Sequence, residues 1–127
     1  LMGDGEINEG QVWESALYCG TKGVDNLVAI IDCNKQQLDG WVKDIMPLDP
    51  LNDKWKSFGW EVIEIDGHDM NQILDAFQKA ETIKGKPTVI IASTIKGKGV
   101  SFMENNLEFH GAAPTKDQYE QAMKELV

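Results

Sequence analysis

The sequence predicts an α/β protein with a doubly wound parallel sheet and helices on both faces. Short apolar runs alternate along the chain with stretches of helical periodicity, as in proteins built from βαβ units. Two of these runs, 26–32 and 88–93, are continuously apolar, which is typical of strands covered on both faces. The 127 residues suffice for one domain with a sizeable hydrophobic core.

The first half of the chain contains three predicted elements and one long loop. Apolar side chains recur at helical spacing over about residues 9–19 and predict a helix. The apolar run at 26–32, with turn residues on both sides, predicts a strand. Residues 33–52 are polar and contain two prolines, so we expect a loop. A short helix is expected over about 51–58.

The second half repeats the alternation. Residues 60–65 alternate between apolar and polar and predict a strand. The apolar positions of segment 73–80 lie at i, i+3, i+4 and i+7, which predicts an amphipathic helix. The run 88–93 predicts the third strand, and right-handed crossovers should join the strands into one parallel sheet.

The C-terminal part is expected to be a loop followed by one helix. Residues 94–114 are punctuated by glycine and predict the loop. Thr115 and Gln118 have the spacing of a capping box, which indicates a helix N-terminus. Apolar residues at helical spacing over 119–126 then predict a helix that packs on the core and carries no site.

Composition excludes several classes of protein. All 12 basic residues are lysines, and against 21 acidic residues they leave a net charge of −9, so a nucleic-acid-binding face is not expected. The longest apolar run, Leu27–Ile31, is far shorter than the roughly 20 residues of a membrane helix. Two cysteines without metal-type spacing indicate a reduced, cytoplasmic chain. Because only two strand-like residues precede Gly3, we expect residues 1–127 to be a single partial domain whose upstream part is missing.

Polar residues at the strand ends predict a ligand site, because ligands bind at the carboxyl ends of parallel strands. Asp4 and Asn34 follow strands joined by one crossover, and their oxygens suit Mg²⁺ or Ca²⁺. Gly3 and Gly5 allow close approach of the backbone, and a helix starting near Glu6 would present its N-terminus to an anion. A tight turn is the alternative for the glycines, but Asn34 at the matching strand end favours a site for a metal and a diphosphate.

The motif Gly3-Asp4-Gly5 with Asn34 resembles the thiamine diphosphate signature, in which Gly-Asp-Gly precedes an Asn-Asn pair. Cys33 replaces the first Asn, whereas the second Asn supplies the metal ligand in that family. The run Gly-Asp-Gly-Glu-Ile-Asn-Glu-Gly-Gln-Val-Trp-Glu, the Asp39-Gly40 pair and Phe109-His110-Gly111-Ala112 indicate the transketolase branch. The resemblance extends over essentially all 127 residues, to the diphosphate-binding domain of a transketolase or the N-terminal subunit of a two-gene version.

The resemblance implies thiamine diphosphate and Mg²⁺ as cofactors, with Ca²⁺ or Mn²⁺ as possible replacements. It assigns the metal to the side chains of Asp4 and Asn34 and the main-chain carbonyl of Gln36. It also places Leu38 near the thiazolium ring and His110 against the diphosphate and the substrate oxygens. The implied cofactor-binding residues are Gly3, Asp4, Gly5, Glu6, Asn34, Leu38 and His110, and the implied catalytic residues are His110 and Glu9.

Glu9 has two interpretations. It is in line with Trp13, Ala16 and Gly20, so it is expected to face inward, where a carboxylate is costly unless paired or protonated. The alternative is a glutamate stabilised by the helix dipole. The resemblance favours the first, because the transketolase glutamates matching Glu9 and Glu14 form a buried acid network between two cofactor sites.

His68, Lys96 and Lys98 are weaker candidates. His68 lies in the turn Asp-Gly-His-Asp, where it could cap the following helix or, by the resemblance, lie near the cofactor rim. Lys96 and Lys98 stand among glycines and either contact a phosphate or remain solvated.

The implied function is transfer of a two-carbon ketol unit from a ketose phosphate to an aldose phosphate, in the pentose phosphate pathway. In the family, a glutamate of a separate pyrimidine-binding domain activates the cofactor, and this sequence has no such domain. We therefore expect activity only with that domain or a C-terminal subunit, in a homodimer or heterotetramer. The alternatives are a deoxyxylulose-phosphate synthase, the alpha subunit of a 2-oxo acid dehydrogenase, or a non-catalytic doubly wound binding module; residues 9–14 argue against the first two.

Overall fold

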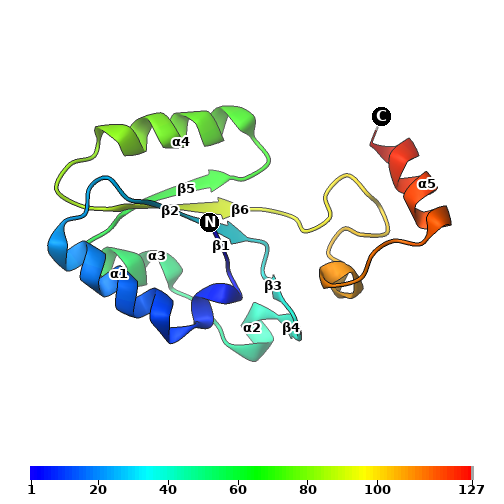
Figure 1. Ribbon diagram of the computed structural model, residues 1–127, viewed down its shortest axis with the longest axis horizontal. Helices are drawn as coiled ribbons and strands as arrows, with labels where there is room; N and C mark the ends of the chain where they lie inside the picture. The colour runs from blue at the N-terminus through cyan, green and yellow to red at the C-terminus, as the bar shows by residue number, and fades with distance from the viewer. Residues whose placement is uncertain (127) are drawn as a thin grey trace.

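A four-stranded, fully parallel sheet forms the centre of the molecule, described for residues 1–126 by a computed structural model (Figure 1). The strand order is β1-β2-β6-β5. Their bounds are Met2–Gly3 for β1, Val28–Cys33 for β2, Glu61–Asp66 for β5 and Thr88–Ser93 for β6. Strand β6 pairs along its whole length with both β2 and β5. The strands expected at 26–32, 60–65 and 88–93 are therefore confirmed.

Helices cover both faces of the sheet, which confirms the doubly wound fold. The helices are α1 (Gly10–Lys22), α2 (Val42–Ile45), α3 (Leu51–Ser57), α4 (Met70–Thr82) and α5 (Lys116–Glu125). Helices α1 and α3 lie on one face and α4 on the other (Figure 1). Right-handed crossovers require this arrangement, because the chain advances from β1 through β2 to β5 and then turns back to β6.

The two faces bury cores of different size. Ile31, Val89 and Ile91 face the larger core beneath α1 and α3, whereas Ile63 and Ile90 face a smaller core beneath α4. Successive residues of β6 thus enter opposite cores, because side chains alternate across a strand. This alternation explains why the four central residues of β6, 89–92, are all apolar.

Aromatic packing fixes α1 against the connection between α3 and β5. Trp55 lies 5.4 Å from Trp13 and 4.8 Å from Trp60, measured between ring centroids. The buried indole N–H of Trp60 donates to the Ala16 carbonyl at 2.8 Å. Gly20 lies against the same connection, and a Cβ added there would lie 1.8 Å from the Phe58 carbonyl oxygen. Helix α1 can approach this closely only because residue 20 has no side chain.

The region 33–52 is more structured than expected. It contains a two-stranded antiparallel hairpin, β3 (Gln36–Gln37) with β4 (Gly40–Trp41), followed directly by α2. Strands of two residues are too short to produce a periodic signal, so the prediction of a loop was wrong. The helix expected to begin near Glu6 was also misplaced, because Glu6–Asn8 form a short 3₁₀ turn and α1 begins at Gly10.

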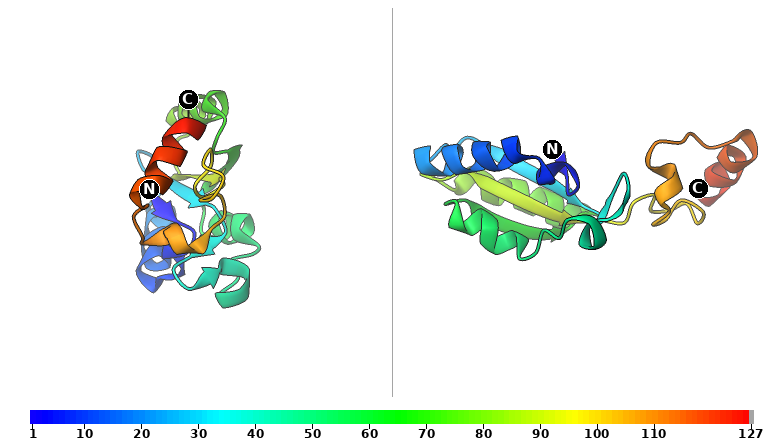
Figure 2. Two further views of the ribbon diagram at one scale, coloured as in Figure 1. Left: turned by 90° about the vertical axis from the view of Figure 1, so that its right-hand side faces the viewer. Right: turned by 90° about the horizontal axis from the view of Figure 1, so that it is seen from below.

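Helix α5 has the expected start but not the expected packing. Both capping-box hydrogen bonds form, from Thr115 N to Gln118 Oε1 at 2.8 Å and from Gln118 N to the Thr115 hydroxyl at 3.3 Å. The helix stands beyond the end of the sheet together with the loop that precedes it (Figures 1 and 2). Tyr119 and Met123 are 56% and 48% exposed. The expectation that this helix packs on the core is therefore wrong for this chain.

None of the helices within residues 1–126 combines the length and the hydrophobicity that crossing a bilayer requires.

Replacing Gly20 by Ala tests the contact between α1 and the α3–β5 connection. We expect a loss of about 1–3 kcal/mol or more in the free energy of unfolding, because the added methyl group overpacks against backbone that cannot move aside. Gly10→Ala in the same helix is the matched control, since nothing lies within 4 Å of a Cβ there. Urea unfolding of both variants provides the measurement, and equal stabilities would contradict the proposed contact.

Candidate functional site

A cavity of about 500 Å³ opens at the carboxyl ends of β1 and β2. All nine predicted site residues contribute to its wall: Gly3, Asp4, Gly5, Glu6, Glu9, Asn34, Gln36, Leu38 and His110. These residues come from the end of β1 and the β1–α1 loop, from the β2–β3 connection and the β3–β4 hairpin, and from the segment after β6. The structure therefore brings together the set that the sequence predicted.

Asp4 is the most deeply buried charged residue of the cavity, with 1% of its surface exposed. Its Oδ2 accepts a hydrogen bond from the Lys35 main-chain N–H at 2.5 Å. Its Oδ1 is buried and has no partner in the described chain. Burial raises the pKa of the Asp4 carboxyl, although the N–H groups of Lys35 and Gly5 act in the opposite direction. A cation beside Oδ1 would satisfy this oxygen and favour the charged form.

Asn34 and Gln36 follow β2 and face the same cavity. The Asn34 side-chain oxygen accepts from the Gln36 N–H at 3.0 Å, which fixes the turn into the hairpin. The Val42 N–H donates to the Lys35 carbonyl at 3.0 Å, so Lys35 and Val42 form a hydrogen-bonded pair of the hairpin, next to the pair of Gln36 with Trp41. Because hydrogen-bonded and non-bonded pairs alternate in an antiparallel ladder, the main-chain groups of Gln36 point away from Trp41. The Gln36 carbonyl is thus free to bind a ligand.

These donors fit a hard divalent cation. They comprise one carboxylate, one amide oxygen and one main-chain carbonyl, the ligand types that Mg²⁺, Ca²⁺ and Mn²⁺ prefer. No group of three His, Cys, Asp or Glu side chains suited to a metal occurs among residues 1–126, so a zinc-type centre is not formed there. Gln36 is 3% exposed, and its side-chain Oε1 and Nε2 are buried without partners within the described chain.

The charges of the wall are unbalanced. Four carboxylates line the cavity, those of Asp4, Glu6, Glu9 and Asp39, against the single ammonium group of Lys96. An anion entering alone would therefore meet net negative charge. A cation held by the oxygen ligands described above would offset this charge and favour the entry of a diphosphate.

Close packing holds the hairpin over the β1–α1 loop. A Cβ on Gly5 would lie 2.5 Å from the Gln37 Cβ, so only glycine permits this contact. The Asn8 amide donates to the Gln37 Oε1 at 3.1 Å and joins the same two segments. Gly3 makes no such close contact, since no atom lies within 4 Å of a Cβ added there. Its main-chain N–H donates to the Glu6 carboxylate at 3.2 Å.

The rim of the cavity is apolar. Leu38 at the tip of the hairpin is 70% exposed, and Ile45 and Met46 beside it are also exposed. This rim could contact the face of a ring, and the placement of Leu38 near the thiazolium ring, which the resemblance implies, stays a prediction. Ile45 and Met46 were missed because they fall in the segment that was expected to be an unstructured loop.

Lys96 and His110 enter the cavity from the segment after β6. The Lys96 Nζ lies 2.5 Å from the His110 Nδ1. If the Lys96 ammonium group donates in this contact, Nδ1 is the acceptor and an imidazole proton would be on Nε2. The predicted approach of His110 to the site is thus present, and of the two candidate lysines Lys96 lines the cavity whereas Lys98 does not.

Glu9 was expected to face inward from a helix, and the structure contradicts that orientation. Glu9 is the N-cap of α1, with an extended backbone, and its side chain is exposed. The predicted stripe of Trp13, Ala16 and Gly20 was extended one position beyond the true start of the helix. The acid network with Glu14 stays a prediction, and Glu14 is exposed too.

His68 lies at a different cavity, of about 540 Å³, at the carboxyl ends of β5 and β6, which Lys98 also lines. Its Nε2 accepts from the Ile95 main-chain N–H at 2.7 Å. The expectation that His68 caps the following helix is wrong, because Asp69 accepts from the N–H groups of Asn71 and Gln72 instead.

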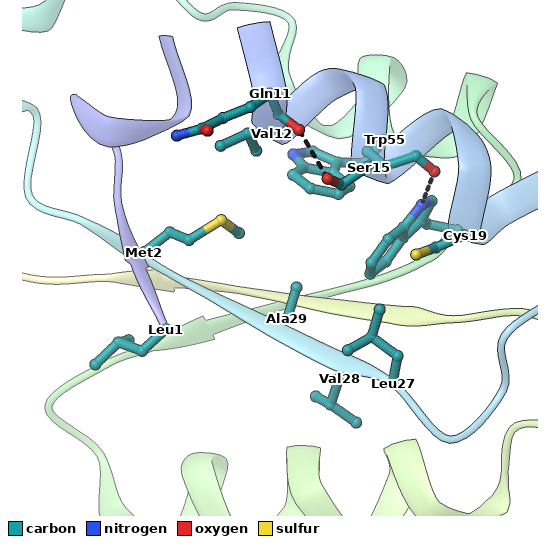
Figure 3. Close-up of a pocket in the computed structure, with 12 residues that line it drawn as sticks. Leu1, Met2, Gln11, Val12, Ser15, Cys19, Leu27, Val28, Ala29 and Trp55 are labelled. Carbon is teal, nitrogen blue, oxygen red and sulfur yellow. Dashed lines mark hydrogen bonds between the residues drawn. The ribbon is translucent and has the colours of Figure 1, made fainter. Parts of the chain in front are cut away.

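Two other features complete the surroundings of the site. Cys33, which stands where the signature has its first Asn, has a thiol pKa raised to about 11 by burial and by the nearby Asp4, so it adds no charge at neutral pH. A further cavity of about 390 Å³ lies between α1 and β2 and is mostly apolar, with Met2, Val12 and Ala29 in its wall (Figure 3). No carboxylate or histidine belongs to its wall, whose sulfur-containing residues are Met2 and Cys19.

Comparisons with known proteins agree with this geometry. A family model described as the thiamine diphosphate-binding domain of transketolase matches residues 1–127. A 6-deoxy-6-sulfo-D-fructose transketolase subunit from Clostridium sp. (strain MSTE9) is 46% identical over 99% of this chain and 46% of its own length. The A subunit of an apulose-4-phosphate transketolase from Phocaeicola vulgatus is 43% identical, over 99% of this chain and 45% of its own. The chain thus spans less than half the length of these relatives.

A crystal structure of transketolase from Campylobacter jejuni superposes with a TM-score of 0.92 and 29% identity, covering 98% of this chain and 20% of that protein. This similarity confirms the fold, a parallel sheet with helices on its faces.

Replacing Asp4 by Asn tests the proposed metal site. The neutral amide removes the partnerless buried charge, so we expect the metal-free protein to be at least as stable as wild type. Added Mg²⁺ or Mn²⁺ should raise the melting temperature of the wild type but not of Asp4→Asn. Thermal unfolding with and without metal measures both effects. Equal stabilisation of the two proteins by metal would contradict the assignment of Asp4.

Proposed function

The chain belongs to the transketolase family through its thiamine diphosphate-binding domain, and from this premise we propose that it holds the diphosphate and a Mg²⁺ ion in a ketol-transferring enzyme. The reaction proposed is transfer of a two-carbon ketol unit from a ketose phosphate to an aldose phosphate. The observation that carries the metal and diphosphate assignment is the buried, partnerless Oδ1 of Asp4 in the cavity shared with Asn34 and Gln36.

The charge balance explains why metal and diphosphate should bind together. A divalent ion held by Asp4, Asn34 and the Gln36 carbonyl would offset the carboxylates of the wall. Lys96 then supplies the remaining positive charge for the phosphate oxygens. The affinity for diphosphate should therefore depend steeply on Mg²⁺.

Thiamine diphosphate, when bound, supplies the electron sink for cleavage of a carbon–carbon bond. The residues of this chain bind and orient its phosphate end. The apolar rim at Leu38, Ile45 and Met46 would exclude water from the ring end. With Nδ1 accepting from Lys96, His110 would carry a proton on Nε2 and could donate it to a phosphate or sugar oxygen whose negative charge increases during the reaction.

The rest of the proposal concerns the assembled enzyme. The two relatives above are named as subunits, which supports a partner that contributes the pyrimidine-binding part. We propose a homodimer or heterotetramer in the cytoplasm, with sugar phosphates as substrates and a role in pentose phosphate metabolism. The proposed acid network of Glu9 and Glu14 would form only in this assembly, which is compatible with their exposure in the single chain.

Calorimetry on the full-length protein with its partner tests the proposed function. Thiamine diphosphate should bind in the presence of Mg²⁺ and bind far more weakly when a chelator removes the ion. Absence of any Mg²⁺-dependent binding would favour the alternative of a non-catalytic module with the same fold.

Lys96→Ala should weaken thiamine diphosphate binding by about tenfold or more, because a hydrogen bond to a charged group contributes roughly 1.5–3 kcal/mol. Lys98→Ala is the matched control. It removes one positive charge as well, but Lys98 stands two residues further along the chain and its side chain does not line this cavity. Titrations at one salt concentration compare the two variants. Equal losses of affinity would show that only the net charge matters.

His110→Ala should leave Mg²⁺ binding nearly unchanged and lower the rate of ketol transfer by about 10²-fold, the order typical of one lost acid–base group. Steady-state transfer with the partner present gives the rate, and the metal-dependent melting temperature gives the control. A loss below about threefold would assign His110 to loop structure alone.

A further inference from the structure

Lys96 and His110 belong to the segment 94–110, whose position depends on how it leaves β6. Its first residue, Thr94, is attached to the end of β2: the Thr94 N–H donates to the Cys33 carbonyl at 3.2 Å, and its hydroxyl donates to the Asp32 carboxylate. The next residue, Ile95, is attached to the end of β5, because its N–H donates to His68 Nε2 at 2.7 Å. Two consecutive residues are thus fixed by the two strands that flank β6.

His68 is itself held firmly in place. The Gly67 N–H donates to the Ser93 carbonyl at 2.8 Å, and the His68 N–H donates to the Asp66 carboxylate at 2.9 Å. A Cβ on Gly67 would lie 2.5 Å from Thr94 Cγ2, so this turn is pressed against the end of β6 as closely as glycine allows. The imidazole therefore presents Nε2 to Ile95 from a rigid support.

The bond to Ile95 also defines the protonation of the ring. A main-chain N–H can only donate, so Nε2 must be unprotonated and His68 acts here as an acceptor. Within the described chain, no main-chain group of the β5–α4 turn donates to or accepts from Ile95, so His68 provides the link between that turn and residue 95.

The effect of this link extends to the cavity through the adjacent residue. The Lys96 carbonyl accepts from the Asn105 N–H at 3.0 Å, which closes the loop between them. The Lys96 Nζ lies 2.5 Å from His110 Nδ1 and so connects the start of the segment with its end. A shift at residue 95 would therefore move both Lys96 and His110 relative to Asp4.

We propose that His68 is a positioning residue of the diphosphate site, which acts through Ile95 to hold Lys96 and His110 in the cavity. It lies at another cavity and does not line the one that contains Asp4. The proposal rests on the proposed function only in naming diphosphate as the ligand of these two residues. The anchoring of the segment rests on the hydrogen bonds above.

Two variants distinguish the role of His68 Nε2 as a hydrogen-bond acceptor from the role of the ring's size. His68→Phe retains an aromatic ring of similar size without an acceptor, whereas His68→Gln retains an acceptor on a chain of similar reach. Met70→Ala is the control, because Met70 is the first residue of α4, two positions after His68, is 67% exposed and makes no side-chain hydrogen bond to the segment within residues 1–126. All proteins are studied at full length with the partner present.

The first readout does not depend on activity: ¹⁵N NMR of the imidazoles reports which ring nitrogen of His110 carries the proton. In the wild type, His110 should show a proton on Nε2. His68→Phe should shift His110 toward a mixture of the two tautomers, and His68→Gln and Met70→Ala should retain the wild-type pattern. A purely structural role of His68 would change the melting temperature without this pattern of loss and rescue.

The second readout is the affinity for inorganic pyrophosphate with Mg²⁺. His68→Phe should weaken it by about threefold to tenfold, the equivalent of one hydrogen bond of roughly 0.5–1.5 kcal/mol, and His68→Gln should restore it. A wild-type His110 spectrum in His68→Phe would overturn the proposal, as would a failure of His68→Gln to rescue either readout.

The two proposals fail in different ways. If the wild-type protein binds no pyrophosphate even with Mg²⁺, the proposed function is wrong, but the NMR readout still decides the role of His68. If the wild type binds pyrophosphate and His68→Phe changes neither readout, the proposed function survives and the positioning role is wrong.

Discussion

The burial of the Asp4 carboxylate is the constraint on which the site depends. Parallel pairing of Met2 with Ile31 and of Gly3 with Asp32 places Asp4 beside the end of β2, where the main chain then turns back toward it. A buried carboxylate with one unpartnered oxygen is costly in a folded protein. Binding a cation would convert this cost into affinity, so the geometry that makes the Asp4 carboxylate costly would also make it a good metal ligand.

The absence of arginine shapes how this protein can bind phosphate. With 12 lysines, 21 acidic residues and no arginine, it has no planar fork for a phosphate group. Within the described wall of the cavity the fixed positive charge comes from Lys96 alone. In the proposed site the metal would therefore supply most of the attraction, and the affinities for metal and diphosphate would depend on each other, as linkage requires.

The sequence predicted the elements whose hydrophobic pattern repeats along the chain. It did not predict the elements whose structure depends on contacts between residues far apart in the sequence. The continuous run in β6 and the periodicity of α4 reveal burial directly, and Asp4 and Asn34 follow from the strand ends. The hairpin β3–β4 depends instead on Gly5 and Gln37 packing together, which no pattern within residues 33–52 encodes. Likewise, the capping box and the apolar stripe of α5 predict a helix, but they do not determine whether this helix packs against the sheet. Lys96 could not be distinguished from Lys98, because their difference lies in which way the loop turns.

Backbone strain marks the two points at which the charged groups of the site are fixed. Apart from glycines, Lys35 and Asn105 are the residues in the described chain with positive φ, at 66° and 56°. Such a conformation costs roughly 1 kcal/mol or more for a residue with a side chain, less for asparagine. The Lys35 N–H donates to the carboxylate of Asp4, the buried negative group of the site. The Asn105 N–H donates to the main-chain carbonyl of Lys96, the residue that supplies the positive charge. Strain tolerated at Lys35 thus directs a main-chain N–H at the Asp4 carboxylate, and strain tolerated at Asn105 fixes the main chain of Lys96, whose side chain extends from there into the cavity.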